Sequence, residues 1–369
     1  MISDRKLMHL EICRDREVGA RRKTTHLSDV ELVHMAMPEL DLGDVSTATR
    51  LFGKQLSAPL MISAMTGGHP SAKKVNESLG MAAAELAVAI SVGSQRAAVE
   101  DARLEDSFRV VREVSDKILV VANMGAAQLL SRGASEFAQK AVKMVSADAL
   151  AIHLNPLQEL VQPRGDSKYK GVLKGISSVV RSIGVPVIVK ETGCGISKEV
   201  AAQLSDAGVA AIEVAGAGGT SWAAVEHYNA LMNGDKAKAE IAETFWDWGI
   251  PTAMSICEAV SARRSLKGKF KVIASGGIKD GIDVAKSLVL GADLAGVARP
   301  LLIPAFHGHK EVAEKLMRIV HELKITCLLC GCRSVGDLGK AKAVISGGLR
   351  DWIEQRGLEI GRVEEVNLR

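Results

Sequence analysis

Eight short hydrophobic segments recur along the chain, and each ends in glycine or polar residues. Polar and apolar positions do not alternate within them, which is typical of strands that helices cover on both faces. The stretches between them have helical periodicity and close on glycines such as Gly208 and Gly291, which we interpret as helix C-caps. The predicted strands span residues 59–64, 89–93, 118–122, 147–153, 186–190, 210–214, 271–275 and 293–297.

Eight successive β/α units close most simply into a (β/α)8 TIM barrel, so the predicted class is α/β. A doubly wound open sheet is the rival fold, but eight units exceed its usual number of strands. We predict one domain over residues 1–369. It comprises an N-terminal extension over 1–58, a barrel over 59–305 and C-terminal helices over 306–369.

Two amphipathic patterns, at 310–329 and 337–355, predict the helices of the C-terminal region. An insertion over 216–249 separates the sixth and seventh strands and contains three of the four tryptophans. It is long enough to cover the mouth of the barrel.

Composition and charge exclude several classes of protein. The net charge of +4 is spread along the chain without a basic block, so we expect no nucleic-acid surface. The N-terminus lacks an apolar signal segment and no run of about 18 apolar residues occurs, so we expect a cytoplasmic protein without a membrane partner.

Cys327, Cys330 and Cys332 form a CxxCxC cluster, but no fourth ligand lies nearby, and we interpret them as buried thiols.

Polar residues or glycines follow every predicted strand. Any one of these segments could be a simple turn, since Gly, Asn and Ser favour turns for local reasons. In a barrel, however, catalytic groups gather at the C-terminal ends of the strands, so the whole set predicts a site there. The segments are 65–68, 94–96, 123–125, 153–155, 190–192, 216–220, 275–277 and 298–299.

The last two strand ends fit a phosphate site. Gly276 and Gly277 would let backbone N–H groups approach an anion, although two tight turns are the alternative. Lys190 ends a strand among apolar residues, where a buried cation needs a partner. That partner could be a reduced flavin, or the carboxylate of Glu191 or Glu213.

The segment from His153 to Glu159 carries the most telling chemistry. Period two places His153 and Asn155 on the same side of the strand. A helix capping box also fits the order of Asn155, Pro156 and Gln158. It does not explain His153 or Glu159. Glu159 could bind Mg²⁺ or simply favour the first turn of a helix, and the segment alone supports both interpretations equally.

Taken together, these residues resemble the type 2 isopentenyl diphosphate isomerases, a flavin-dependent family, over nearly the whole chain. The HLNPLQE segment and the N-terminal Arg-Lys pair are specific, whereas the glycine turns are shared with many flavin barrels. The motifs are RKLMH at 5–9, AMTGG at 64–68, SVGSQR at 91–96, HLNPLQE at 153–159, GAGGTSW at 216–222 and SGG at 275–277.

The resemblance implies a role for each matching residue. Gln158, His153 and Asn155 would be catalytic, and Glu159 would bind Mg²⁺. FMN would be held by Ala64, Met65, Thr66, Ser94, Asn123, Lys190, Thr220, Gly276, Gly277 and Ala298. The diphosphate substrate would be bound by Arg5, Lys6, Ser94, Gln95, Arg96, His153, Asn155 and Gln158. Two departures from the family pattern, Lys279 for Arg and Ala215 for Ser, are expected to change flavin affinity more than reaction type.

The implied reaction interconverts isopentenyl and dimethylallyl diphosphate in isoprenoid biosynthesis. N5 of reduced FMN would donate one proton, and either Gln158 or the flavin would take part in the second transfer, since an amide is a poor base. NAD(P)H would serve only to reduce FMN. The family is usually homotetrameric or homo-octameric.

Two other functions compete with this one. An FMN-dependent 2-hydroxy-acid oxidase or dehydrogenase needs a His base and an Arg beside the flavin, for which His307, His309 and Arg299 are loose candidates. It would leave Gln158 and Glu159 without a role. A catalytically silent flavin- or phosphate-binding protein would not need so many polar groups at the mouth.

Overall fold

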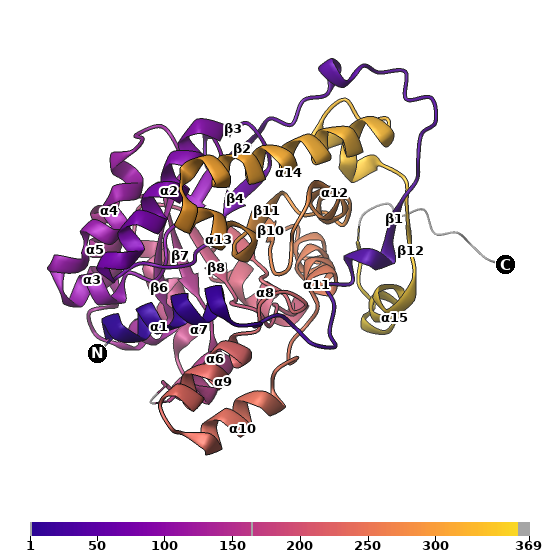
Figure 1. Cartoon of the computed structure of the whole chain (residues 1–369). Helices are drawn as coiled ribbons and strands as arrows, with labels where there is room; N and C mark the ends of the chain where they lie inside the picture. Colours follow the sequence, from indigo (N-terminus) through magenta and orange to yellow (C-terminus); the bar gives the residue numbers. More distant parts are fainter. Residues whose placement is uncertain (1, 164, 361–369) are drawn as a thin grey trace.

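Eight parallel strands form a closed barrel in the computed structural model of the chain, which describes residues 2–163 and 165–360 (Figure 1). Strands adjacent in sequence pair with one another, and β11 returns to β4 to close the barrel. Every strand overlaps a predicted segment, so the (β/α)8 prediction is confirmed. The strands are β4 (Leu60–Ile62), β5 (Ala89–Ser91), β6 (Val120–Gly125), β7 (Ala149–His153), β8 (Val187–Lys190), β9 (Ala211–Glu213), β10 (Lys271–Ala274) and β11 (Leu294–Val297).

Helices follow the strands and surround the barrel (Figure 1). Local signals set their ends: the Ser197 hydroxyl caps α8, and the backbone of Gly208 and Gly291 adopts the positive φ expected of glycines that end helices. The helices between and after the strands are α2 (Pro70–Leu86), α3 (Arg96–Glu100), α4 (Asp106–Glu113), α5 (Ala134–Met144), α6 (Pro156–Val161), α7 (Val172–Ser182), α8 (Lys198–Asp206), α11 (Thr252–Ser265), α12 (Gly281–Val289) and α13 (Arg299–His307), with 3-10 turns η3 (Ala102–Leu104) and η4 (Ala126–Leu130).

A hairpin closes the N-terminal end of the barrel. Its strands are β2 (Thr49–Leu51) and β3 (Lys54–Leu56). Leu51 and Leu56 are buried against inward-facing residues of the barrel strands such as Met61 and Leu119. Hydrophobic side chains therefore fill this end, and the polar strand ends lie at the other.

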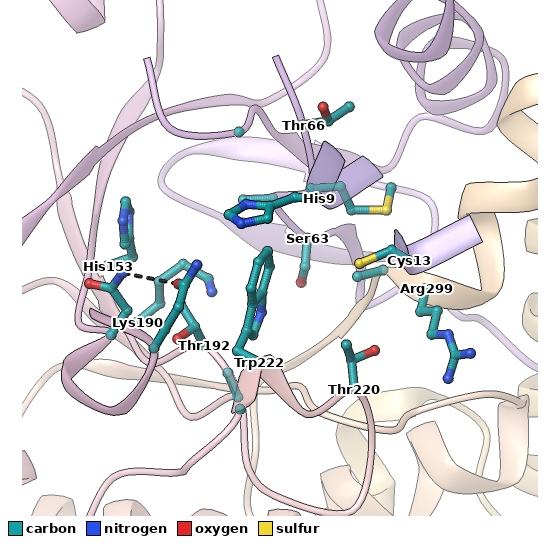
Figure 2. Close-up of a pocket in the computed structure, with 18 of the residues that line it drawn as sticks. His9, Cys13, Ser63, Thr66, His153, Lys190, Thr192, Thr220, Trp222 and Arg299 are labelled. Carbon is teal, nitrogen blue, oxygen red and sulfur yellow. Dashed lines mark hydrogen bonds between the residues drawn. The ribbon is translucent and has the colours of Figure 1, made fainter. Parts of the chain in front are cut away.

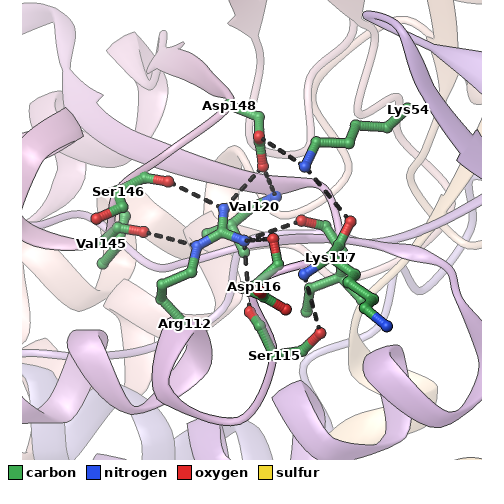
Figure 3. A network of polar contacts seen from close by, with 10 residues as sticks. Lys54, Arg112, Ser115, Asp116, Lys117, Val120, Val145, Ser146 and Asp148 are labelled. Atoms are coloured by element: carbon green, nitrogen blue, oxygen red, sulfur yellow. Dashed lines mark hydrogen bonds and ion pairs between the residues drawn. The ribbon is translucent and has the colours of Figure 1, made fainter.

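An ion pair between Lys54 and Asp148 ties this hairpin to the barrel, and the same carboxylate binds the Arg112 guanidinium of α4 (Figure 3). The guanidinium donates to Asp148 Oδ2 at 2.7 Å, and the same carboxylate accepts from the backbone N–H of Val120 at 2.9 Å and lies 3.2 Å from Lys54 Nζ. Burial raises the pKa of Asp148, but these hydrogen bonds and cations outweigh it and hold the pKa below its usual value.

Replacing Asp148 by asparagine is expected to lower the free energy of unfolding by about 2–4 kcal/mol at neutral pH, because Arg112 and Lys54 lose their counter-charge. A lowered folded pKa stabilises the protein above the unfolded pKa, and this contribution disappears as pH falls through the folded pKa. The difference in free energy of unfolding between wild type and variant should therefore narrow below about pH 4, as measured by urea unfolding. Asp116→Asn is the control, because only the backbone carbonyl of Asp116 contacts Arg112. An equal loss in the control would contradict the prediction.

The two ends of the chain meet in a small antiparallel sheet. The N-terminal extension contains η1 (Leu27–Asp29), β1 (Val30–Leu32) and η2 (Leu42–Asp44), and β1 pairs with β12 (Ala343–Ile345). The helix predicted at 310–329 is confirmed as α14 (His309–Leu329). The helix predicted at 337–355 is wrong in its first half, where η5 (Val335–Lys340) and β12 precede α15 (Gly347–Arg356), because pairing with β1 extends the backbone there.

Residues 361–369, which fall in the predicted C-terminal helical region, lie outside the described residues. Among the helices of the described chain, none has both the length and the apolar character that spanning a membrane would require.

The insertion over 216–249 lies at the C-terminal end of the barrel. It forms α9 (Trp222–Met232) and α10 (Lys236–Thr244). Helix α1 (Ile2–Asp15) from the N-terminal extension packs on α9 through Ile12, beside Ala224 and Val225 (Figure 1). The beginning of the chain thus supplies one wall of the barrel mouth.

Candidate active site

A cavity of about 680 Å³ opens at the C-terminal ends of the barrel strands. All eight strands contribute lining residues at or directly after their ends, and helices α1, α6, α9 and α13 add further lining residues. Figure 2 shows His153 and Lys190 on one side, Thr220 and Arg299 on the other, and Ser63 between them. The volume lies within the range of ligand-binding pockets.

One side of the cavity is built from backbone. Gly276 has a φ of +99°, and a Cβ atom there would lie 2.2 Å from the carbonyl oxygen of Gly216. A Cβ at Gly219 would lie 2.3 Å from the backbone nitrogen of Gly277. Glycine is therefore required at both positions, and the loops that follow β9 and β10 meet backbone to backbone. Such a cradle can present N–H groups to a phosphate.

Lys190 is a buried cation that faces this cavity, with 6% of its surface exposed. Its Nζ donates to the backbone carbonyl of Glu191 at 2.6 Å. The Glu191 carboxylate instead accepts from the three backbone N–H groups that follow it, and burial raises its pKa to about 7. Since Lys190 makes no ion pair with Glu191 or Glu213, its charge is available to an anionic ligand.

His153 is held as a neutral ring. Its Nδ1 lies 2.8 Å from Asn123 Oδ1, and Asn123 Nδ2 donates to the carbonyl of Val92. This arrangement places the ring proton on Nδ1 and leaves Nε2 as an acceptor. Burial, with Lys190 and Lys6 nearby, lowers the pKa of His153 to about 3.

The capping-box interpretation of the next segment is wrong. Asn155 has the backbone position of an N-cap, but its side chain makes no hydrogen bond to the first turn of α6. Its Nδ2 donates to Gln158 Oε1 at 3.0 Å and to Glu159 Oε1 at 3.1 Å. The side chains that could have capped the helix bind one another at the cavity wall instead.

A carboxylate from α9 orders this wall. Glu226 is fully buried, and its Oε1 accepts from Gln158 Nε2 at 3.0 Å. The same oxygen lies 3.0 Å from His9 Nε2, at ion-pair distance but without hydrogen-bond alignment. Burial raises the pKa of Glu226, but His9 and the hydrogen bonds outweigh it, so the net pKa is lowered. The imidazole of His9 packs edge-on to Trp222.

Helix α1 brings basic groups to the rim. Arg5 and Lys6 line the cavity, and Lys6 Nζ donates to the carbonyl of Ser94 at 2.6 Å. Burial, reinforced by the charge of Arg5, lowers the pKa of Lys6 to about 7. The Lys6 amine is therefore only partly protonated near pH 7, and a bound anion would favour its protonated form.

Full-length relatives decide which family this is. Proteins named isopentenyl-diphosphate delta-isomerase match from Methanothermobacter thermautotrophicus (46% identical, 97% of this chain and 98% of the relative), Methanothrix thermoacetophila (47%, 96% and 96%) and Archaeoglobus fulgidus (46%, 96% and 99%). The chain belongs to this isomerase family.

Other similarities agree with the cofactor and the fold of the isomerase family. Residues 126–345 match the model of a family described as FMN-dependent dehydrogenase, which supports FMN as the cofactor. The flavin-binding domain of baker's yeast flavocytochrome b2 has a TM-score of 0.66 at 18% identity, covering 87% of this chain and 79% of that one. A mandelate oxidase variant with (S)-mandelic acid has a TM-score of 0.62 at 18% identity, covering 92% and 94%. At that identity the likeness concerns the fold alone.

The residues assigned from the isomerase resemblance are brought together at this cavity, with one exception. Gln95 does not line it: its side chain is fully buried, accepts from the backbone N–H of Asn123 and donates to the carbonyl of Ala141. The lining residues are Arg5, Lys6, Ala64, Met65, Thr66, Ser94, Arg96, Asn123, His153, Asn155, Gln158, Glu159, Lys190, Thr220, Gly276, Gly277 and Ala298. Their individual roles stay predictions.

The sequence reasoning assigned no site role to His9, Trp222 or Glu226. The first two lie inside motifs quoted for the isomerase family, so a signal was present. Glu226 lies one helical turn after Trp222, but nothing in the sequence shows that this face of α9 meets Gln158.

The groups required by a hydroxy-acid oxidase are not assembled. His307 is exposed and pairs with Glu311, and neither His307 nor His309 lines the cavity. Arg299 lines it but pairs with Glu17 at 3.1 Å. Neither His307 nor His309 therefore pairs with Arg299 as a base within the cavity.

Proposed function

We propose that this protein interconverts isopentenyl diphosphate and dimethylallyl diphosphate with reduced FMN, Mg²⁺ and NAD(P)H as the flavin reductant. The observation that carries the proposal is the row of neutral groups, His153, Asn155 and Gln158, that faces the same cavity as Lys190 and the glycine cradle. A hydroxy-acid oxidase would need a His base paired with a carboxylate-binding Arg beside the flavin.

The residues on both sides of the cavity fit an FMN molecule. Gly276, Gly277 and Thr220 would hold its phosphate, and Lys190 would face its ring. Reduced FMN, when bound, supplies an electron-rich face and an exchangeable proton to a ligand stacked on it. The basic groups of α1 and the row of neutral groups would then determine where the substrate lies.

The diphosphate would lie at the rim formed by α1. Arg5, Lys6 and Arg96 would neutralise its charge, and Glu159 would hold Mg²⁺. No group of three or more His, Cys, Asp or Glu side chains that could hold a metal occurs in residues 2–163 and 165–360. A single carboxylate, that of Glu159, beside a diphosphate fits Mg²⁺, which commonly takes one or two carboxylates and completes its shell with phosphate and water.

The hydrocarbon end would face the neutral row. Moving the double bond adds a proton to one alkene carbon and removes a proton from another, so positive charge develops on a tertiary carbon. A protonated imidazole would repel that charge, and the lowered pKa of His153 prevents this. Glu226 fixes the amide of Gln158, which would hold the alkene in one orientation. Trp222 adds an aromatic edge to the same wall.

The proposal extends to assembly and location. We propose a cytoplasmic homotetramer or homo-octamer, because the family resemblance implies these states. Light scattering of the purified protein would measure the assembly.

Purified protein incubated anaerobically with FMN, NADPH, Mg²⁺ and isopentenyl diphosphate should form dimethylallyl diphosphate, without NADPH consumption in proportion to product. A parallel reaction with a 2-hydroxy acid and an electron acceptor should show no turnover. Absence of product from reduced, FMN-loaded protein would overturn the proposal.

The lowered pKa of Lys6 gives the reaction a specific pH dependence. The amine is protonated below about pH 7. We therefore expect kcat/KM to fall by up to about tenfold per pH unit above pH 7, whereas kcat changes less because bound diphosphate restores the charge. The Lys6→Arg variant keeps its charge and should lose this inflection. An unchanged inflection in that variant would assign it to another group.

A further inference from the structure

Glu213 is a second buried charge at the floor of the cavity, and the reaction proposed above does not use it. It ends β9, lines the cavity and is 1% exposed. Lys190 lies beside it in register on β8. Because neighbouring residues in register point to the same face of a sheet, both side chains face the barrel interior.

The Glu213 carboxylate is held by two hydroxyl groups. Its Oε1 accepts from Ser63 Oγ, after β4, at 2.8 Å and from Ser275 Oγ, after β10, at 2.9 Å. Ser275 Oγ in turn accepts from the backbone N–H of Ala215 at 3.2 Å, so its own proton is committed to Glu213. Two hydroxyl groups thus donate to the same carboxylate oxygen, which accepts both hydrogen bonds.

Gly296 makes room for this arrangement. A Cβ atom there would lie 2.2 Å from Ser63 Oγ, 3.1 Å from Ser275 Cβ and 3.4 Å from Glu213 Oε1. The carboxylate and its two serines thus occupy space on the inner side of β11 that any larger residue would close.

Glu213 lies between the two ends of the flavin position. The glycine cradle after β10 marks the phosphate end, and Lys190 on β8 marks the ring end. Glu213 sits on β9, between those strands, and its partner Ser63 appears between Lys190 and Thr220 in Figure 2. A flavin that spans the cavity therefore passes over the carboxylate.

We propose that Glu213 is a positioning residue for the electrostatics of the flavin: its charge opposes that of Lys190 and keeps the reduction potential of bound FMN low. This inference rests on FMN occupying the cavity. Reduction adds negative charge to the flavin, and a fixed anion at the floor of the same cavity would disfavour that reduction in a site of low dielectric. A low reduction potential means that the reduced flavin is electron-rich. Such a flavin suits stabilisation of a cation, whereas a flavin of high potential suits acceptance of electrons from a substrate.

Glu213→Gln tests the charge while keeping the shape. The amide oxygen can still accept from both serines, so a purely structural role predicts an unchanged potential. We expect the affinity ratio for reduced over oxidised FMN to rise about tenfold in Glu213→Gln, which is about +30 mV for a two-electron couple. Glu213→Asp keeps the charge and should restore most of the wild-type potential. Spectroelectrochemistry of the holoprotein measures all three.

Glu258→Gln is the matched control. Glu258 is also fully buried but does not line the cavity, so its substitution should leave the potential unchanged. An equal potential in wild type and Glu213→Gln, or an equal shift in both variants, would overturn the proposal.

If the Glu213→Gln variant does not retain FMN, a second measurement tests the proposal. The reduced-minus-oxidised infrared difference spectrum of wild-type holoprotein should contain a carboxylate band that moves in Glu213→Asp. Absence of such a band would overturn the proposal as well. If wild-type protein binds no FMN, the cofactor assignment fails instead, and the two failures are thereby distinguished.

Discussion

Substitution of Glu159 by glutamine is expected to reduce turnover at saturating Mg²⁺ by about a hundredfold or more, because metal stabilisation of a diphosphate amounts to several kcal/mol. The amide keeps the size of the side chain but loses the charge that a divalent cation needs. Glu159 lies at the rim, and its carboxylate accepts from Asn155 and from the backbone N–H of Asp166. The FMN spectrum should not change, since the glycine cradle and Lys190 are untouched.

A Mg²⁺ titration of the initial rate separates this effect from general damage. Wild type should saturate, whereas Glu159→Gln should respond weakly at every concentration. Glu136→Gln, an exposed carboxylate on α5 that pairs with Lys140, serves as the control and should match wild type. Loss of flavin together with activity would leave the metal role of Glu159 unsupported.

The Gly276→Ala variant is expected to purify without FMN. The added Cβ would meet the carbonyl oxygen of Gly216 at 2.2 Å and its nitrogen at 2.6 Å, and neither can move without shifting a barrel loop. The positive φ of Gly276 adds strain of about 1–3 kcal/mol for any other residue. Together we expect at least about 3 kcal/mol, which corresponds to a Kd for FMN weakened more than about a hundredfold.

The ratio of flavin absorbance to protein, followed by FMN titration of the apoprotein, measures this loss. Gly133→Ala is the matched control: Gly133 precedes α5, its φ is −91°, and a Cβ atom there meets nothing within 4 Å. Normal flavin content in Gly276→Ala would show that the two loops can separate and that the cradle is not required.

The barrel was predictable because the sequence signal for each strand is local. Mainly hydrophobic segments that end in glycine or polar residues identify all eight strands, and the capping signals at Ser197 and Gly208 locate a helix closely. The segment 337–355 was not predictable in the same way. Its amphipathic pattern favours a helix, but part of it pairs with β1, more than three hundred residues earlier in the chain, and no local signal reports such a partner.

The site was predictable as a set of strand ends, but not in its internal contacts. Parallel strands bring their C-terminal ends together, so His153, Lys190 and Gly276 had to converge. Side-chain partners were less accessible. Asn155 contacts Gln158 and Glu159 instead of capping α6, because Glu226 draws Gln158 into the wall, and that depends on how α9 folds back over the barrel. Gln95 falls within a cavity-lining motif, yet its amide is used to hold Asn123.

The pairing of β1 with β12 has a consequence for how the enzyme is made. Val30 lies opposite Ile345, so the first strand finds its partner only after the ribosome has synthesised residue 345. Helix α1, which precedes that strand and carries Arg5 and Lys6, cannot be anchored through this sheet before then. We therefore expect flavin loading in the cell to follow synthesis of β12, and nascent chains that stall short of residue 343 to hold α1 less firmly at the mouth of the barrel.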